Sequence, residues 1–106
     1  MVVRINKKKI NMVVCTSFWK RFRGMMFQRK KENGYYFPNC NGVHTFFMIQ
    51  PIDLVLTDSN DTILYVYPNV KPWRLILPKK NVHHTYEFPV GLLPDIKPKD
   101  TIKKEH

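Results

Sequence analysis

Short runs of apolar and β-branched residues alternate with turn residues along most of the chain. The longest uncharged apolar stretch begins at His44 and passes through Pro51 into a strand-like segment, 52–57. Extended segments are predicted at 2–5, 10–15, 35–37, 43–48, 52–57, 62–67, 75–77 and 83–88. The pattern predicts a mostly β protein, a barrel-like sheet of about seven short strands.

Turn residues fix how two of these segments connect. Residues 58–61 read Asp-Ser-Asn-Asp and join 52–57 to 62–67 as a hairpin. Asn33-Gly34 is a strong turn dipeptide, so we expect a second turn there.

One segment near the N-terminus has helical spacing instead. Phe18, Phe22 and Met25 are four and three residues apart, as on one face of a helix. Thr16-Ser17 resembles an N-cap and Gly24 a C-cap. The spacing predicts a helix over 17–24, which makes the fold class α+β.

Charge is the strongest compositional signal. The chain of 106 residues has a formal charge of +10. Residues 1–31 hold ten of the basic residues and no acidic one, which predicts a basic N-terminal face. Such a charge attracts polyanions, namely nucleic acid, an anionic membrane surface or an acidic partner, without choosing among them.

The length indicates one domain, 1–106, with a frayed tail at 103–106. The two cysteines, Cys15 and Cys40, are expected to be reduced thiols of a cytoplasmic protein. The N-terminus does not resemble a signal peptide, and no apolar run has the length of a membrane span. We expect a monomer without a cofactor.

Five blocks in order resemble the DUF192 family of small bacterial and archaeal proteins over about residues 12–102. They are Thr16 with Arg21-Phe22-Arg23-Gly24-Met25-Met26, His44-Thr45-Phe46-Phe47-Met48, Pro51-Ile52-Asp53, Pro72-Trp73, and Glu87-Phe88-Pro89-Val90-Gly91 ahead of a final Asp100. Met25, Gln28 and Val90 depart from the usual Leu, Arg and Ala, and Lys99 stands where the family has Gly before Asp. The resemblance implies a compact, mostly β fold with a short helix, and it implies no reaction.

Two site hypotheses follow from the residues. Cys40, His44 and Asp53 could act as a nucleophile, its base and an orienting carboxylate of a small hydrolase or thiol enzyme. Alternatively, Cys40 is a small buried residue, and Asp53 is a structural carboxylate that bonds backbone N–H groups or pairs with Arg23.

The interpretation we favour is a non-enzymatic binding or accessory module. Its polar pocket near His44 and Asp53 would bind an unidentified ligand or acidic partner. The predicted binding residues are Arg21, Arg23, His44, Asp53 and Glu87.

The sequence bears on two further classes of site. A zinc site would draw on Cys15, Cys40, His44, His83 and His84, but the chain lacks paired ligand spacing, so no metal is expected. Single-stranded nucleic acid could bind basic and aromatic side chains together. The candidates are Trp19, Lys20, Arg21, Phe22, Arg23, Tyr35, Tyr36 and Trp73.

Overall fold

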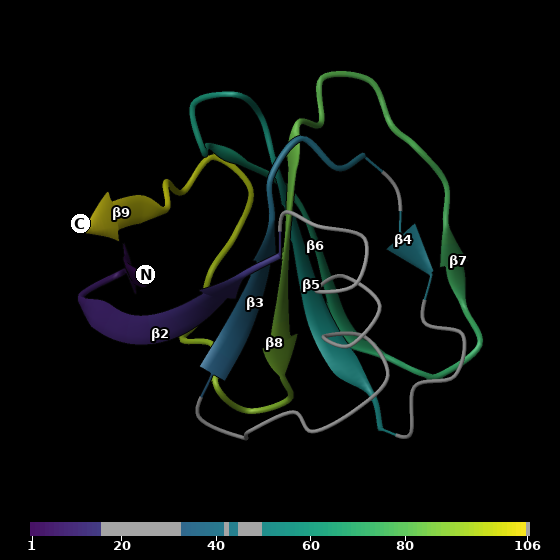
Figure 1. Cartoon of the computed structure of the whole chain (residues 1–106), viewed down its shortest axis with the longest axis horizontal. Coiled ribbons are helices and arrows are strands. Elements are labelled where there is room, and N and C mark those ends of the chain that lie inside the picture. The colour runs from purple at the N-terminus through teal and green to yellow at the C-terminus, as the bar shows by residue number, and fades with distance from the viewer. Residues whose placement is uncertain (16–32, 42, 45–49, 106) are drawn as a thin grey trace.

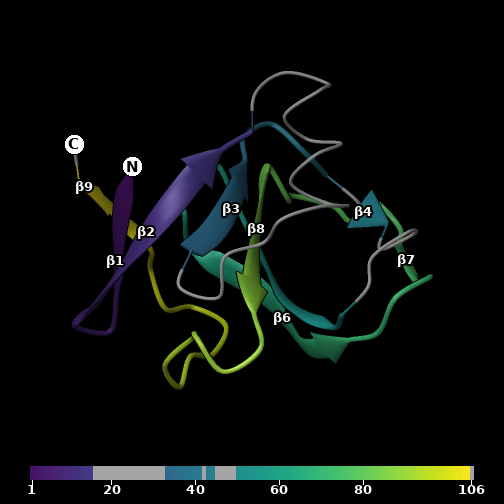
Figure 2. The ribbon, with the colours of Figure 1, turned by 60° about the horizontal axis from the view of Figure 1, so that its bottom comes forward.

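A mixed sheet of seven strands forms the body of the protein. The structure is a computed structural model that describes residues 1–15, 33–41, 43–44 and 50–105. The strands are β1 (Val2–Ile5), β2 (Lys8–Val14), β3 (Asn33–Phe37), β5 (Ile52–Thr57), β6 (Ile63–Val70), β8 (His84–Pro89) and β9 (Lys103–Glu105). Their order is β6-β5-β8-β3-β2-β1-β9. The sheet curls into a half-barrel (Figures 1 and 2), as the alternation of short strands and turns predicts.

A second, two-stranded sheet pairs β4 (Val43–His44) with β7 (Leu75–Ile76). Figures 1 and 2 place β7 on the opposite side of the molecule from β1 and β9. Ile76 packs against the buried Ile52 and Leu54, so this small sheet is attached to the main one through β5.

The register explains which side chains reach the core. Antiparallel pairs are β1–β2, β1–β9, β3–β8, β5–β6 and β5–β8, whereas β2 and β3 are parallel. All six residues of β5 are buried, which accounts for the long apolar stretch in the sequence, because a central strand covered on both faces need not alternate.

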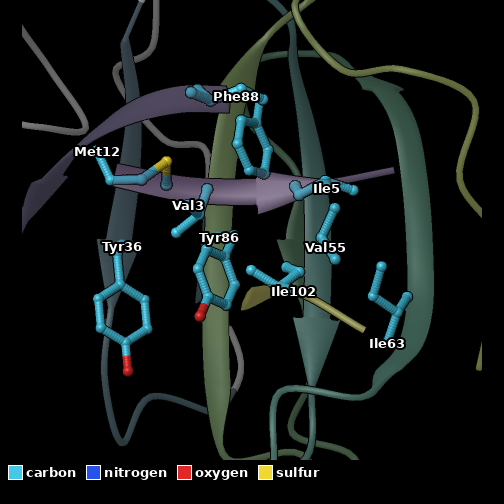
Figure 3. Packing of buried hydrophobic residues seen from close by; sticks show 10 residues of the cluster. Val3, Ile5, Met12, Tyr36, Val55, Ile63, Tyr86, Phe88 and Ile102 are labelled. Carbon is cyan, nitrogen blue, oxygen red and sulfur yellow. The ribbon is translucent and has the colours of Figure 1, made fainter. Parts of the chain in front are cut away.

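The main core lies on one face of the curled sheet (Figure 3). It contains Val3, Ile5, Ile10, Met12, Tyr36, Val55, Ile63, Tyr86, Phe88 and Ile102. Two smaller apolar clusters contain Cys15, Tyr35 and Phe37, and Ile52 with Leu54.

The β1–β2 hairpin shows how local chemistry fixes register. Ile5 pairs with Lys8, so Asn6 and Lys7 form a two-residue loop, and both have positive φ, 47° and 73°. Two such residues make the turn whose twist matches that of paired strands.

The predicted turn at Asn33-Gly34 is wrong, since both residues belong to β3. Gly34 is required there by a close contact between strands. A Cβ at this position would lie 2.6 Å from Met12 Sδ and 2.9 Å from Phe88 Cδ1. A glycine in a strand marks such an approach as readily as it marks a turn.

The predicted frayed tail is also wrong for residues 103–105, which form β9 against β1 through the pairs Val2–Glu105 and Arg4–Lys103. Pairing with the free edge of β1 supplies the backbone hydrogen bonds that an isolated tail would lack. Strand β6 also runs beyond its predicted end to Val70.

Some predictions fall on undescribed residues. The helix over 17–24 lies outside the described residues, and no helix occurs in the described ranges. Of the strand predicted over 43–48, only Val43–His44 is described.

Candidate functional site

Asp53, a predicted binding residue, holds a bulge in the neighbouring strand. Its Oδ1 accepts a hydrogen bond of 2.7 Å from the backbone N–H of Asn69. The β5–β6 register shifts between Ile52 and Leu54, and Asn69 has a positive φ of 54°. The carboxylate therefore satisfies a backbone donor that the irregular ladder would otherwise leave unpaired.

Glu87, a second predicted binding residue, is fully buried on β8. Across the strands, Glu87 pairs with Leu54 and Tyr35, whereas Asp53 pairs with Phe88. Because directly paired residues share a face and neighbours along a strand alternate, the register places Asp53 and Glu87 on opposite faces of the sheet.

Of the other predicted pocket residues, only His44 lies within the described part of the chain. Arg21 and Arg23 lie outside the described residues. The backbone of His44 is in β4, opposite Leu75 and one pair away from Ile76. Since Ile76 packs against Ile52 and Leu54, the fold brings the β4 backbone near the start of β5.

Cys40, the candidate nucleophile, is half-buried and packs against the cluster of Cys15, Tyr35 and Phe37. Its carbonyl oxygen accepts a 2.9 Å hydrogen bond from Thr85 Oγ1, which ties the loop after β3 to β8. Neither Cys15 nor Cys40 forms a disulfide within the described part of the chain. The described residues include no cluster of three or more His, Cys, Asp or Glu side chains able to hold a metal ion.

A network of polar side chains that the sequence did not indicate lies at one end of the main core. Tyr86 OH donates to Asp61 Oδ1 at 2.7 Å, and Lys104 Nζ pairs with Asp61 Oδ2 at 3.1 Å. Lys104 also donates to Tyr36 OH at 2.7 Å and lies 4.4 Å above the Tyr36 ring. The two tyrosine rings stack with centroids 4.7 Å apart, and their hydroxyls point the same way (Figure 3).

His84 extends the network to the loop after β3. The backbone N–H of Asn39 lies 3.2 Å from His84 Nδ1, and Tyr36 OH lies 3.3 Å from the same atom. A backbone N–H can only donate, so Nδ1 is the acceptor and a neutral ring carries its proton on Nε2. Tyr36 then accepts from Lys104 and donates to His84.

Burial and neighbouring charges shift the pKa values of this network. Burial lowers the pKa of His84, and Lys104 and His83 add to this effect, although Asp61 opposes it. Burial and the hydrogen bond to Asp61 raise the pKa of the Tyr86 hydroxyl. Burial alone would lower the pKa of Lys104, but its bonds to Tyr36 and Asp61 prevail, and that pKa is raised. The network therefore favours a neutral His84 beside a positively charged Lys104.

Part of the predicted basic N-terminal face is neutralised by the C-terminal strand. Glu105 on β9 lies 3.0 Å from Arg4 and 3.5 Å from Lys9. Lys8 Nζ donates to the carbonyl oxygen of Leu92. These cations are therefore engaged within the protein.

A different segment, residues 71–80, combines exposed apolar and basic side chains, and we call it the β7 edge. Trp73, Leu75 and Leu77 occupy alternate positions and are 57%, 58% and 63% exposed. Ile76 between them packs inward. The basic members of the β7 edge are Lys71, Arg74, Lys79 and Lys80, and no acidic residue occurs between Thr62 and Tyr86.

The β7 edge continues onto strand β6 through an aromatic contact. Lys79 Nζ lies 5.5 Å from the centre of the Tyr65 ring, and Tyr65 stacks with Tyr67 at 6.2 Å. The backbone N–H of Lys79 donates to Asn41 Oδ1 at 2.9 Å, and Asn41 Nδ2 donates back to the Lys79 carbonyl at 2.8 Å. This reciprocal pair anchors the C-terminal end of the β7 edge to the loop after β3.

Sequence reasoning included Trp73 only as one aromatic in a nucleic-acid hypothesis and did not identify the β7 edge. Its signal was present, because three large apolar residues alternate there beside four cations. That signal is the same as for a half-buried strand, and only the placement of β7 shows which side faces solvent. No helix in the described ranges combines the length and apolar character needed to cross a membrane.

Comparisons with known proteins agree with the fold and the resemblance. The family model DUF192, described as "Uncharacterized ACR, COG1430", matches residues 1–103. The UPF0127 protein PH1112 of Pyrococcus horikoshii is 34% identical over 97 residues, which cover 85% of this chain and 84% of that protein. The UPF0127 protein TK1120 of Thermococcus kodakarensis is 35% identical over 83 residues, 73% of this chain but only 52% of the relative.

A solved structure shows the same fold at low identity. It is a protein of unknown function from Novosphingobium aromaticivorans, with a TM-score of 0.79 and 16% identity, covering 97% of this chain and 84% of that one. At this identity the likeness concerns the fold alone. The match of the family model to nearly the whole chain, together with the Pyrococcus relative, shows that the chain belongs to the DUF192 family.

Proposed function

We propose that this protein is a non-enzymatic binding module that presents the β7 edge to a polyanionic partner. The observation that supports it is the exposure of Trp73, Leu75 and Leu77, each more than half accessible, within a segment that carries only positive charge. Contiguous exposed apolar side chains beside polar ones are typical of interaction surfaces.

The charge of the β7 edge favours a negatively charged partner. Lys71, Arg74 and Lys80 are exposed, and Lys79 is half-buried against Tyr65. On the opposite side of the molecule, Arg4 and Lys9 pair with Glu105. Cations beside exposed apolar groups add electrostatic attraction and orientation to an apolar contact.

Binding to three chemically different polyanions tests the proposal: polyuridylate RNA, polyglutamate, and vesicles containing phosphatidylglycerol. The variant Lys79→Gln/Lys80→Gln should weaken binding to at least one of them by roughly 25-fold, because each of the two cations contributes about fivefold near a strongly anionic surface. The matched control is Lys97→Gln/Lys103→Gln, which removes the same charge from exposed positions elsewhere and should change binding by less than about threefold. Equal losses in the two variants, or no binding to any probe, would overturn the proposal.

The pocket predicted around His44 and Asp53, with Arg21, Arg23 and Glu87, stays a prediction. So does the thiol-enzyme alternative with Cys40 and His44. The rate of Cys40 alkylation against pH, measured in a Cys15→Ser variant, checks the alternative. A thiolate forming well below the ordinary cysteine pKa of about 8.5 would favour it, and an ordinary or raised value would count against it.

A further inference from the structure

We infer that the partner of the β7 edge is the surface of an anionic lipid bilayer, which the protein binds peripherally. This inference rests on the proposed function and names the class of partner for the same surface. Three properties of the β7 edge favour a bilayer over RNA or an acidic protein: the kind of apolar side chain, its position at the margin of the molecule, and the order of charges along the segment.

The apolar side chains suit a lipid interface. Two of the three are leucines, which offer no flat ring for a nucleic-acid base to stack on, and the third is Trp73. Tryptophan is enriched at the level of lipid headgroups, and leucine partitions into the acyl region below. Moving a half-exposed side chain of this size out of water favours the bound state by about tenfold.

Position also favours a bilayer. Strand β7 lies at the margin of the molecule in both views (Figures 1 and 2). Leu75 and Leu77 are exposed there, whereas Ile76 between them packs inward. Side chains that project from a margin can enter a soft planar surface without a matching groove. A protein partner would need a cavity shaped to receive three large side chains.

The charges bracket the apolar residues along the chain. Lys71 and Arg74 flank Trp73, and Lys79 and Lys80 follow Leu77 by two and three residues. Basic side chains on both sides of an inserted apolar tip would meet phosphate groups around it. The long stems of lysine and arginine let their charged ends reach headgroups while the backbone stays close to the interface.

The first test measures co-sedimentation with vesicles of phosphatidylcholine alone, or mixed with phosphatidylglycerol at a molar ratio of about 7:3. The wild type should partition at least about tenfold more strongly onto the mixed vesicles, and high salt should reduce this difference. Leu77→Ser should weaken partitioning by about tenfold. Val90→Ser is the matched control, because Val90 is 51% exposed but lies outside the β7 edge, and it should change partitioning by less than about twofold.

A second measurement locates the contact. Tryptophan fluorescence of the wild type should be quenched by lipids carrying bromine on their acyl chains, and Trp73→Phe should lose most of that quenching. Equal partitioning onto neutral and mixed vesicles, or equal losses in Leu77→Ser and Val90→Ser, would overturn the inference. If RNA or polyglutamate binds in a Lys79/Lys80-dependent manner while vesicles do not, the lipid inference fails and the binding function stands. If no probe binds through the β7 edge, both fail.

Discussion

Lys99 occupies a backbone conformation that favours glycine, so replacing it should stabilise the protein. Residues 97–100 form a tight turn in which the Asp100 N–H donates to the Lys97 carbonyl oxygen at 3.2 Å. Pro98 takes the second position, and Lys99 takes the third with a φ of 82°. This is the geometry of a type II turn, whose third position strongly prefers glycine. The family pattern also has glycine before the final Asp, so this chain keeps the turn with a less suitable residue.

The size of the effect follows from two opposing terms. An L-residue in the left-handed region costs about 1–2 kcal/mol relative to glycine. Glycine loses more conformational freedom on folding, which returns roughly 0.5–1 kcal/mol. Lys99 is exposed, and its backbone N–H, bonded to the Ile63 carbonyl at 2.8 Å, survives the change. Lys99→Gly should therefore raise the free energy of unfolding by about 0.5–1 kcal/mol.

Thermal and guanidinium unfolding, followed by circular dichroism at neutral pH, measure this change. A gain of that size corresponds to a melting temperature higher by roughly 2–8 °C for a domain of this length. The control is Lys99→Ala, which removes the same side chain and charge but keeps a Cβ at positive φ, and it should not be stabilised. If Lys99→Gly were no more stable than Lys99→Ala, the strain assigned to this turn would be refuted.

Four further predictions concern residues inside the fold. The lowered pKa of His84 means that the unfolded chain binds more protons than the folded one between the folded pKa and about 6.5, so stability should fall as pH drops through that range. His84→Asn keeps an acceptor near Asn39 but does not titrate, and unfolding measured at several pH values should show a smaller loss than in the wild type. Asp53→Ala should lower the free energy of unfolding by about 2–3 kcal/mol, because the Asn69 N–H loses its hydrogen-bond acceptor. Asp53→Asn, which keeps an oxygen acceptor, should lower the free energy of unfolding by about 1 kcal/mol. Equal losses in the two variants would argue against this hydrogen bond as the cause. Gly34→Ala should lower the free energy of unfolding by about 1–3 kcal/mol, because the added methyl group overpacks Met12 and Phe88. In a double-mutant cycle, adding Met12→Ala should recover part of that loss. Strictly additive effects of the two substitutions would contradict this prediction. Lys104→Met, which breaks a part-buried ion pair, should cost about 2 kcal/mol in denaturant unfolding. Glu105→Gln, whose partners are exposed, should cost less than about 1 kcal/mol.

The strands could be predicted from the sequence where local pattern and burial agree. The hairpin of 52–57 with 62–67 became β5 and β6, because β-branched and aromatic runs flank an Asp-Ser-Asn-Asp turn. Asp53 stood out correctly as an acid within an apolar strand. Its partner, the Asn69 N–H, could not be predicted, because it depends on a bulge sixteen residues further along.

The errors share one physical origin, which is contact between residues distant in sequence. Gly34 reads as a turn residue until Met12 and Phe88 are placed against it. The polar network joins Tyr36 to His84 and Lys104, which are 48 and 68 positions away. No periodicity encodes such partners, so the tail that carries Lys104 was predicted to fray.

The C-terminal strand engages part of the basic N-terminal face that the sequence predicts. Counting charges along the chain points to the N-terminus, but β9 returns to β1 and sets Glu105 against Arg4 and Lys9. Lys104, on the same strand, turns inward to Asp61 and Tyr36. Two cations of the first strands and one of the last thus stabilise the sheet. The proposed binding surface lies instead at the β7 edge, where positive charge accompanies exposed leucine and tryptophan. A partner that recognised charge alone would have little reason to prefer this edge, whereas one that also buries apolar side chains would.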